Sequence, residues 1–112
     1  MAEISIDQFA AVNMRVGRVI RTADFPQARK PAYKLWIDFG ELGIRQSSAQ
    51  LTRRYSREAL EGRLVVAVVN LAPRQIADFR SEVLVLGAVD GTGDVILLQP
   101  DDGGVTLGAR IA

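Results

Sequence analysis

Leu64-Val-Val-Ala-Val-Val69 and Val83-Leu-Val-Leu86 are two wholly apolar runs, rich in β-branched residues, and they decide the fold of this chain. Such runs are typical of strands that are buried on both faces. The polar connector between them is Asn70-Leu-Ala-Pro-Arg-Gln-Ile-Ala-Asp-Phe-Arg-Ser-Glu82. It is far longer than the two-residue turn of a tight hairpin, and long loops inside compact domains are often functional. We therefore expect a rigid pair of strands that presents a binding loop.

The composition is that of a globular protein and excludes several classes of chemistry. Its 112 residues suggest a single domain over residues 1–112, with an ordinary hydrophobic content of 48%. The chain has no cysteine and no histidine, which excludes disulfides, thiolate nucleophiles and Ser-His pairs. Its acidic residues are too scattered for a paired-carboxylate site, so we expect no enzyme activity, no metal and no cofactor. We see no signal peptide or membrane span and expect a cytoplasmic protein without membrane insertion.

The charges are distributed unevenly although the net charge is only +1. Residues 15–80 carry 13 of the 14 basic residues and six acids, a local balance of +7. Twelve of the 14 cations are arginine, the side chain best suited to bidentate phosphate contacts and to stacking on bases. This asymmetry indicates a polyanionic partner. The equally good alternative is a solvated surface that is rich in arginine.

Short strands separated by glycine-marked turns dominate the rest of the sequence. The clearest signal is the alternation over residues 32–39, which places Leu35 and Ile37 on one face and Lys34 and Trp36 on the other. We expect further strands at residues 14–22, at 44–51, at 94–99 and near 109–111. The first of them should have a bulge or sharp coiling at Gly17-Arg18, where a glycine interrupts the alternation.

Two helical segments accompany these strands. Ser5-Ile-Asp-Gln8 has capping-box spacing and predicts a short helix over residues 7–12. A mixed helical segment follows at residues 52–62. The residues expected to face inward are Ile4, Phe9 and Val12 in the first segment and Tyr55, Ala59 and Leu60 in the second. Together these elements predict an all-β protein: a five-stranded OB-fold barrel with a short N-terminal helix and a small helix between strands 3 and 4.

The outward face of the strand at residues 32–39 is a candidate binding surface. In an OB-fold, strands 2 and 3 form the usual ligand face together with flanking loops. An exposed Trp36 beside Lys34 and Arg45 would stack on a nucleic acid base or pack against a peptide side chain. The alternative is that Trp36 is buried against the N-terminal helix or a partner subunit, because one ring is a small stacking platform.

The connector supplies the other candidates. Arg74 and Arg80 would meet phosphate or the edge of an RNA base. For Asn70 and Ser81, taken alone, a structural role is favoured, since an asparagine at the end of a strand commonly caps a loop by bonding its own backbone.

Several motifs, taken together, resemble the tRNA-binding domain that is appended to methionyl-tRNA synthetases and that also occurs in free-standing tRNA-binding proteins. These motifs are Asn13-Met-Arg-Val-Gly-Arg-Val19, Lys34-Leu-Trp-Ile-Asp-Phe-Gly40, Asn70-Leu-Ala-Pro-Arg74 and Ser81-Glu82. Two others resemble the CsaA-like chaperones of this family, which are linked to protein export. They are Arg45-Gln-Ser-Ser-Ala-Gln-Leu-Thr52 and Phe79-Arg-Ser-Glu-Val-Leu-Val-Leu-Gly87.

The resemblance implies an OB-fold homodimer that binds tRNA and, in CsaA-like members, also unfolded or pre-secretory polypeptides. It also implies that Asn70, Arg74 and Ser81 belong to an RNA-facing surface. Departures from the general pattern at Ala49-Gln50, Asp78 and Val83-Leu84 leave room for peptide binding.

These arguments lead to two sets of expected binding residues. The RNA-binding residues are Lys34, Arg45, Asn70, Arg74, Arg80 and Ser81, and the peptide-binding residues are Trp36, Ser48, Gln50 and Phe79. The predicted function is an ATP-independent, CsaA-like chaperone that also binds tRNA. The alternative is a free-standing tRNA-binding module that acts on RNA structure rather than on polypeptides.

Overall fold

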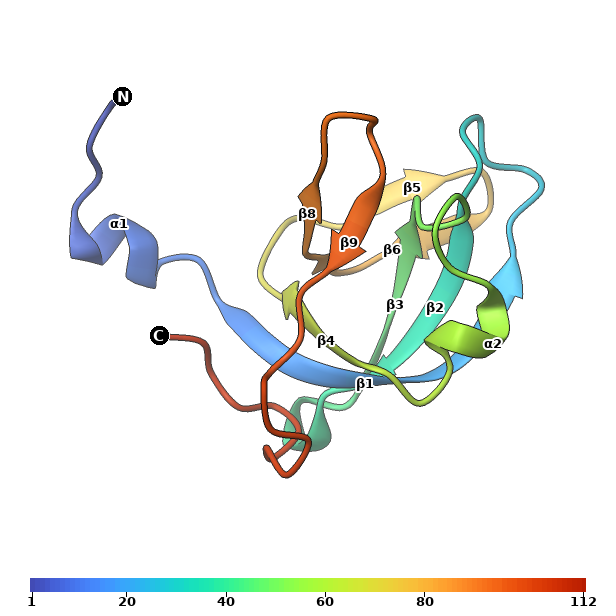
Figure 1. Ribbon diagram of the computed structural model, residues 1–112. Helices are drawn as coiled ribbons and strands as arrows, with labels where there is room; N and C mark the ends of the chain where they lie inside the picture. Colours follow the sequence, from blue (N-terminus) through green and yellow to red (C-terminus); the bar gives the residue numbers. More distant parts are fainter.

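Five antiparallel strands form one sheet that curls into a nearly closed barrel in the computed structural model, which describes residues 1–112 (Figure 1). The strand order is β3-β2-β1-β4-β7. The strands of the barrel are β1 (Met14–Asp24), β2 (Tyr33–Asp38), β3 (Ile44–Ala49), β4 (Leu64–Val68) and β7 (Leu84–Val85). Two separate hairpins pair β5 (Arg74–Ile76) with β6 (Phe79–Ser81) and β8 (Gly87–Val89) with β9 (Val95–Leu97). The prediction of an all-β, OB-type barrel is confirmed.

β1 joins the two halves of the barrel, because it pairs with both β2 and β4. Its register against β2 shifts between Val19 and Arg21. The bulge therefore lies there, and of the two alternatives predicted at Gly17-Arg18, a bulge or sharp coiling, the bulge is wrong. Gly17 serves close packing instead, because a Cβ at this position would lie 2.5 Å from Cγ2 of Ile37. Because glycine has no side chain, the β1 backbone can pack directly against the core side chains at this position.

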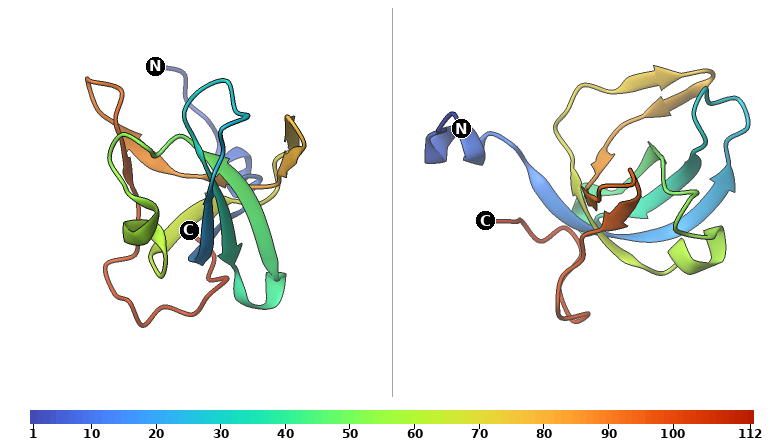
Figure 2. Two further views of the ribbon diagram at one scale, coloured as in Figure 1. Left: turned by 90° about the vertical axis from the view of Figure 1, so that its right-hand side faces the viewer. Right: turned by 45° about the horizontal axis from the view of Figure 1, so that its top comes forward.

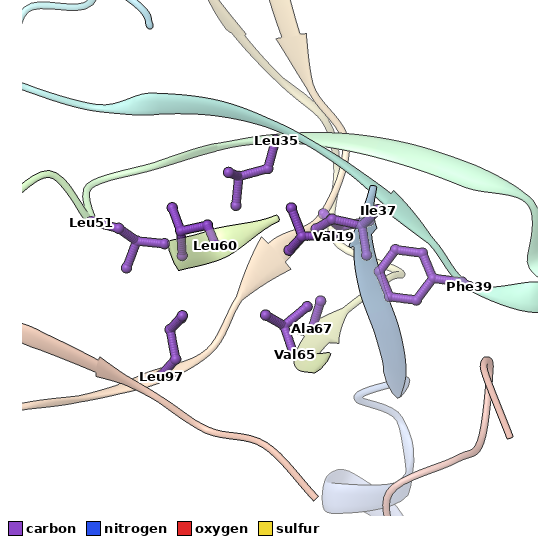
Figure 3. Close-up of a cluster of buried hydrophobic side chains, with 10 residues drawn as sticks. Val19, Leu35, Ile37, Phe39, Leu51, Leu60, Val65, Ala67 and Leu97 are labelled. Atoms are coloured by element: carbon purple, nitrogen blue, oxygen red, sulfur yellow. The ribbon is translucent and has the colours of Figure 1, made fainter. Parts of the chain in front are cut away.

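One cluster of buried apolar side chains fills the interior of the barrel (Figure 3). β4 is buried along its whole length, as its apolar run predicts. The same prediction for the run Val83-Leu-Val-Leu86 is wrong, because Leu84 is 50% exposed. β7 is the last strand of the sheet, and only its inward face is covered. The cluster consists of Val19, Leu35, Ile37, Phe39, Leu51, Leu60, Val65, Ala67, Val83 and Leu97.

Both predicted helices are present, as α1 (Ile6–Ala10) and as α2 (Arg57–Leu60), which lies between β3 and β4. The predicted capping box begins α1: the amide of Gln8 donates to Ser5 Oγ at 3.1 Å, and the amide of Ser5 donates to Gln8 Oε1 at 2.7 Å. None of the residues of α1 is buried, and the helix stands away from the barrel (Figure 1).

Some of the inward positions predicted for these segments are wrong. Ile4 and Val12, which flank α1, are exposed, because this segment stands away from the barrel (Figure 1). In α2, Leu60 is buried but Ala59 lies at the surface. The strand predicted near residues 109–111 is reduced to a single bridge between Arg110 and Arg15. Neither helix has the length and apolar character needed to cross a membrane.

The connector between the two apolar runs contains the hairpin β5–β6 and is not the open loop that was predicted (Figure 2). Ile76 pairs with Phe79, which leaves Ala77 and Asp78 as a two-residue turn. Ala77 has a φ of 53°, a left-handed conformation that glycine and asparagine usually supply. The hairpin lies beside the loop that links β1 to β2 (Figure 2).

Side chains close the barrel between β3 and the segment that precedes β7. The amide of Gln46 donates to Glu82 Oε1 at 3.0 Å, and the amide of Glu82 donates to the carbonyl of Gln46 at 2.8 Å. Two residues further along β3, the amide of Ser48 donates to Ser81 Oγ at 3.0 Å. We call Gln46, Ser48, Ser81 and Glu82 the closing seam. Carboxylate and hydroxyl oxygens there replace part of a main-chain ladder.

Candidate ligand-binding groove

A groove of about 750 Å³ lies between three segments of the chain: the β1–β2 loop over residues 25–32, the end of β3 and the hairpin β5–β6. This position, between the second and third strands of the barrel and the loops after its first and fourth strands, is the usual ligand site of an OB barrel. Each segment contributes one amide side chain to the lining, namely Gln27, Gln50 and Gln75. The apolar part of the lining is small and consists of Ala28, Ala32, Ile76 and Ala77.

Three cations also line the groove: Arg29 and Lys30 from the β1–β2 loop and Arg74 from the hairpin. None of them takes part in an ion pair, since the ion pairs of the structure join Arg53, Arg54 and Arg57 to acids elsewhere. Unneutralised cations in a concave site raise the local concentration of anionic ligands.

The groove brings together three of the residues expected to bind ligand, Ser48, Gln50 and Arg74. Arg29 and Lys30 were not among the expected site residues, although the sequence shows two adjacent cations in a loop. What the sequence does not show is that this loop lies opposite the connector. That proximity depends on the hairpin β5–β6, which was not predicted.

Trp36 and Lys34 lie on the outward face of β2, as the alternation predicts, while Leu35 and Ile37 face the core. Trp36 is half-buried, and α1 does not cover it (Figure 1). Its ring instead lies 4.4 Å below the guanidinium of Arg21 and meets the ring of Phe79 edge-on at 6.0 Å. Phe79 is only 6% exposed, so its ring faces β2 and not the groove.

The sequence predicts Arg45 beside Trp36, but in the structure the two side chains lie on different faces. The register pairs Trp36 with Gln46 and pairs Arg45 with Ile37, whose side chain faces the core. Arg45 therefore lies on the opposite face of β3 from the Lys34 and Trp36 surface, where it is half-buried.

The remaining expected residues, Arg80, Ser81 and Asn70, do not line the groove. Arg80 is exposed, and it alternates with Phe79 along β6 and so lies on the opposite face of the hairpin. Ser81 belongs to the closing seam, which agrees with the structural role favoured for it.

Asn70 also has a structural role, but its bonds differ from those predicted. Its side chain does not cap its own loop and instead holds the N-terminal segment. Asn70 Oδ1 accepts from the amide of Asn13 at 2.9 Å, and its Nδ2 donates to the carbonyl of Ala11 at 2.8 Å. Asn70 thereby lines a second hollow, of about 540 Å³, beside α1.

Comparisons with known proteins agree with this geometry. Residues 14–110 match the family described as putative tRNA binding domain. The chain is similar in structure to the chaperone CsaA of Bacillus anthracis str. Ames, with 49% identity, a TM-score of 0.93 and coverage of 99% of this chain and 100% of that one. It is also similar to the CsaA chaperone protein of Picrophilus torridus, with 48% identity, a TM-score of 0.91 and coverage of 98% and 100%.

Among curated proteins, a methionine–tRNA ligase of Thiobacillus denitrificans (strain ATCC 25259 / T1) is 43% identical over 106 residues, which is 89% of this chain and 15% of that protein. Two further methionine–tRNA ligases match similarly, and the chain spans only 14–16% of the length of these relatives. The family that this shared region matches is described as a tRNA-binding domain and not as a catalytic one. Because the family match covers most of its length, this protein belongs to the tRNA-binding-domain family.

Proposed function

We propose that the protein is a cytoplasmic, ATP-independent chaperone, similar to CsaA, that binds unfolded or pre-secretory polypeptides in its groove and so assists protein export. The lining of the groove supports this proposal. Gln27, Gln50 and Gln75 come from three different segments, and a glutamine side chain has two donor hydrogens and an acceptor oxygen. One donor of Gln75 is already used by the carbonyl of Ala77, at 3.1 Å. The main chain of an extended polypeptide offers matching groups at every residue, whatever its sequence. Ile76 and the alanines add apolar contact for client side chains.

An aggregation assay tests the polypeptide-binding function. We expect the purified protein to suppress the aggregation of an unfolding client without ATP, and we expect Ile76→Ser to weaken this effect. Leu42→Ser is the matched control, because Leu42 is an exposed apolar residue in the turn between β2 and β3, outside the groove. Unchanged client aggregation in the presence of excess wild-type protein would exclude the chaperone function.

We propose tRNA binding as a second function. Arg29, Lys30 and Arg74 supply unpaired positive charge in the groove, and residues 15–80 carry the basic excess of the chain. Affinity for tRNA should fall steeply with salt, because phosphate contacts release counterions. Arg74→Ala should lower both the affinity and the salt dependence. A salt-independent interaction, or an Arg74→Ala variant that binds tRNA like wild type, would contradict this role.

We further propose that the protein is a homodimer in which α1 packs against a second copy. α1 has five residues and buries none of them, whereas helices this short are unstable in water without tertiary packing. Ile6 is 78% exposed, and the hollow beside α1 has apolar walls that include Phe9, Val12 and Ile111. In a twofold-symmetric dimer, the same surface of each copy would cover α1 of the other copy.

Light scattering in solution tests the dimer. We expect twice the mass of one chain for wild type, and a shift toward monomer for Ile6→Asp. Glu3→Lys is a control that changes charge in the same segment without placing a charge at an apolar position. A monomeric wild-type protein at micromolar concentration would rule the dimer out.

A further inference from the structure

Aromatic and cationic side chains pack against one another across the outward face of β2. The ammonium of Lys34 lies 4.8 Å from the ring centroid of Phe25 and 5.2 Å from that of Phe79. The two rings meet edge-on at 5.4 Å. Phe79 contacts Trp36, which in turn lies below Arg21. We call Phe25, Lys34, Phe79, Trp36 and Arg21 the cation–aromatic row.

The row joins the two opposite walls of the groove. Phe25 begins the β1–β2 loop, whereas Phe79 is the first residue of β6 in the hairpin. Both rings are buried, at 3% and 6% exposure, although neither belongs to the core cluster inside the barrel. Lys34, from β2, is the residue that contacts both of them.

The hairpin has few other attachments to the barrel. β5 and β6 form their own two-stranded sheet, and such hairpins are marginally stable by themselves. Near its base, Gln46 Nε2 donates to the carbonyl of Arg80 at 2.8 Å and the amide of Ser48 donates to Ser81 Oγ. At the end near the turn, the contacts of Phe79 within the row hold the hairpin.

We propose that Lys34 is a positioning residue that fixes the separation of the two groove walls, and that its ammonium contacts the rings and not the ligand. A cation near a ring face is attracted by the negative charge of the π system, and more strongly when both groups are desolvated. Lys34 is half-buried, and no carboxylate pairs with it. This assignment replaces the RNA contact that the sequence predicts for Lys34. Of the two experiments that test it, only the tRNA-binding measurement rests on the proposed function of the groove.

A matched pair of variants tests the assignment without ligand. The chain has only two lysines, and Lys30 lies exposed in the same groove, so Lys30→Gln repeats the chemical change of Lys34→Gln. Trp36 is the only tryptophan and reports on the row by its fluorescence. We expect Lys34→Gln to raise the acrylamide quenching of Trp36 and to speed amide hydrogen exchange in β5–β6 about fivefold, equivalent to about 1 kcal/mol. Lys30→Gln should change neither, and Lys34→Arg should restore both.

The salt dependence of tRNA binding separates positioning from phosphate contact. Each lost phosphate contact lowers the slope of log affinity against log salt by somewhat less than one, about 0.7–0.9. We expect Lys34→Gln to weaken binding with no change of slope, and Lys30→Gln to lower the slope. Unchanged quenching and exchange in Lys34→Gln, or a lowered slope, would overturn the proposal. If wild type binds no tRNA, the proposed RNA function fails, while quenching and exchange still decide the role of Lys34.

Discussion

Replacing Glu82 by alanine would remove the carboxylate that holds the main chain of β3 in the closing seam. Glu82 Oε1 accepts from the part-buried amide of Gln46 at 3.0 Å. A hydrogen bond to a charged group contributes about 1.5–3 kcal/mol, and the low end applies because the site is only part-buried. The bond from the amide of Glu82 to the carbonyl of Gln46 remains, at 2.8 Å, so the variant should still fold.

We therefore expect the free energy of unfolding of Glu82→Ala to fall by about 1.5 kcal/mol, which for a domain of this size lowers the melting temperature by about 6 °C. Glu82→Gln keeps a neutral acceptor and should lose about half as much. Denaturant unfolding followed by circular dichroism measures both losses, and hydrogen exchange at Gln46 locates them. Glu41→Ala is the control, because Glu41 is exposed in the turn before β3. Equal stability of the Glu82→Ala and Glu41→Ala variants would refute a stabilising role for the seam.

Three further predictions concern other parts of the molecule. Gly17→Ala should destabilise the protein by about 2–3 kcal/mol in thermal unfolding, because the new Cβ overlaps Ile37; Gly91→Ala has open space around its Cβ and should cost less than 1 kcal/mol. Asn70→Ala should speed hydrogen exchange at Asn13 and lower the proportion of dimer, whereas an RNA-contact role alone would leave both unchanged. The side chain and amide of Thr92 donate to the carboxylate of Asp90 and hold its pKa below the ordinary value of 3.8. The folded-state pKa is depressed, so this stabilisation is present above about pH 3.8 and is lost as the pH falls below it. The stability difference between wild type and Asp90→Asn should shrink over that range in denaturant unfolding, and a difference that grows on acidification would contradict this account.

The elements that the sequence predicted well are those with strong local signals. The alternation over residues 32–39 placed Lys34 and Trp36 outward, because side chains on a strand must alternate. The capping box of Ser5 and Gln8 placed α1, since its bonds join residues three apart. β4 followed from an unbroken apolar run.

The elements that the sequence did not reveal depend on contacts between distant segments. β5 and β6 have three residues each, too few to establish a period, and their turn contains Ala77 and Asp78 rather than a typical pair such as Asn-Gly. The predicted face of Arg45 was wrong because β3 is polar on both faces, so the sequence did not fix its register against β2. A register shift of one residue moves every side chain of a strand to the other face. The groove depends on the proximity of residues 25–32 to this hairpin. For that reason Gln27, Arg29, Lys30 and Gln75 could not be assigned to it from the sequence.

The closing seam also bears on the proposed chaperone function, because a protein that holds unfolded chains must avoid pairing with them as strands. The edge of a β-sheet is a template on which extended polypeptides add as new strands, and this addition begins aggregation. In this protein the edge of β3 beside the groove is already occupied: Glu82 uses both the amide and the carbonyl of Gln46, and Ser81 uses the amide of Ser48. A segment held in the groove would therefore meet side chains at the β3 wall, such as Ser48 and Gln50, and not an open row of β3 main-chain groups. Such a segment would not extend the barrel sheet at β3, so its release would break no main-chain hydrogen bonds to that strand.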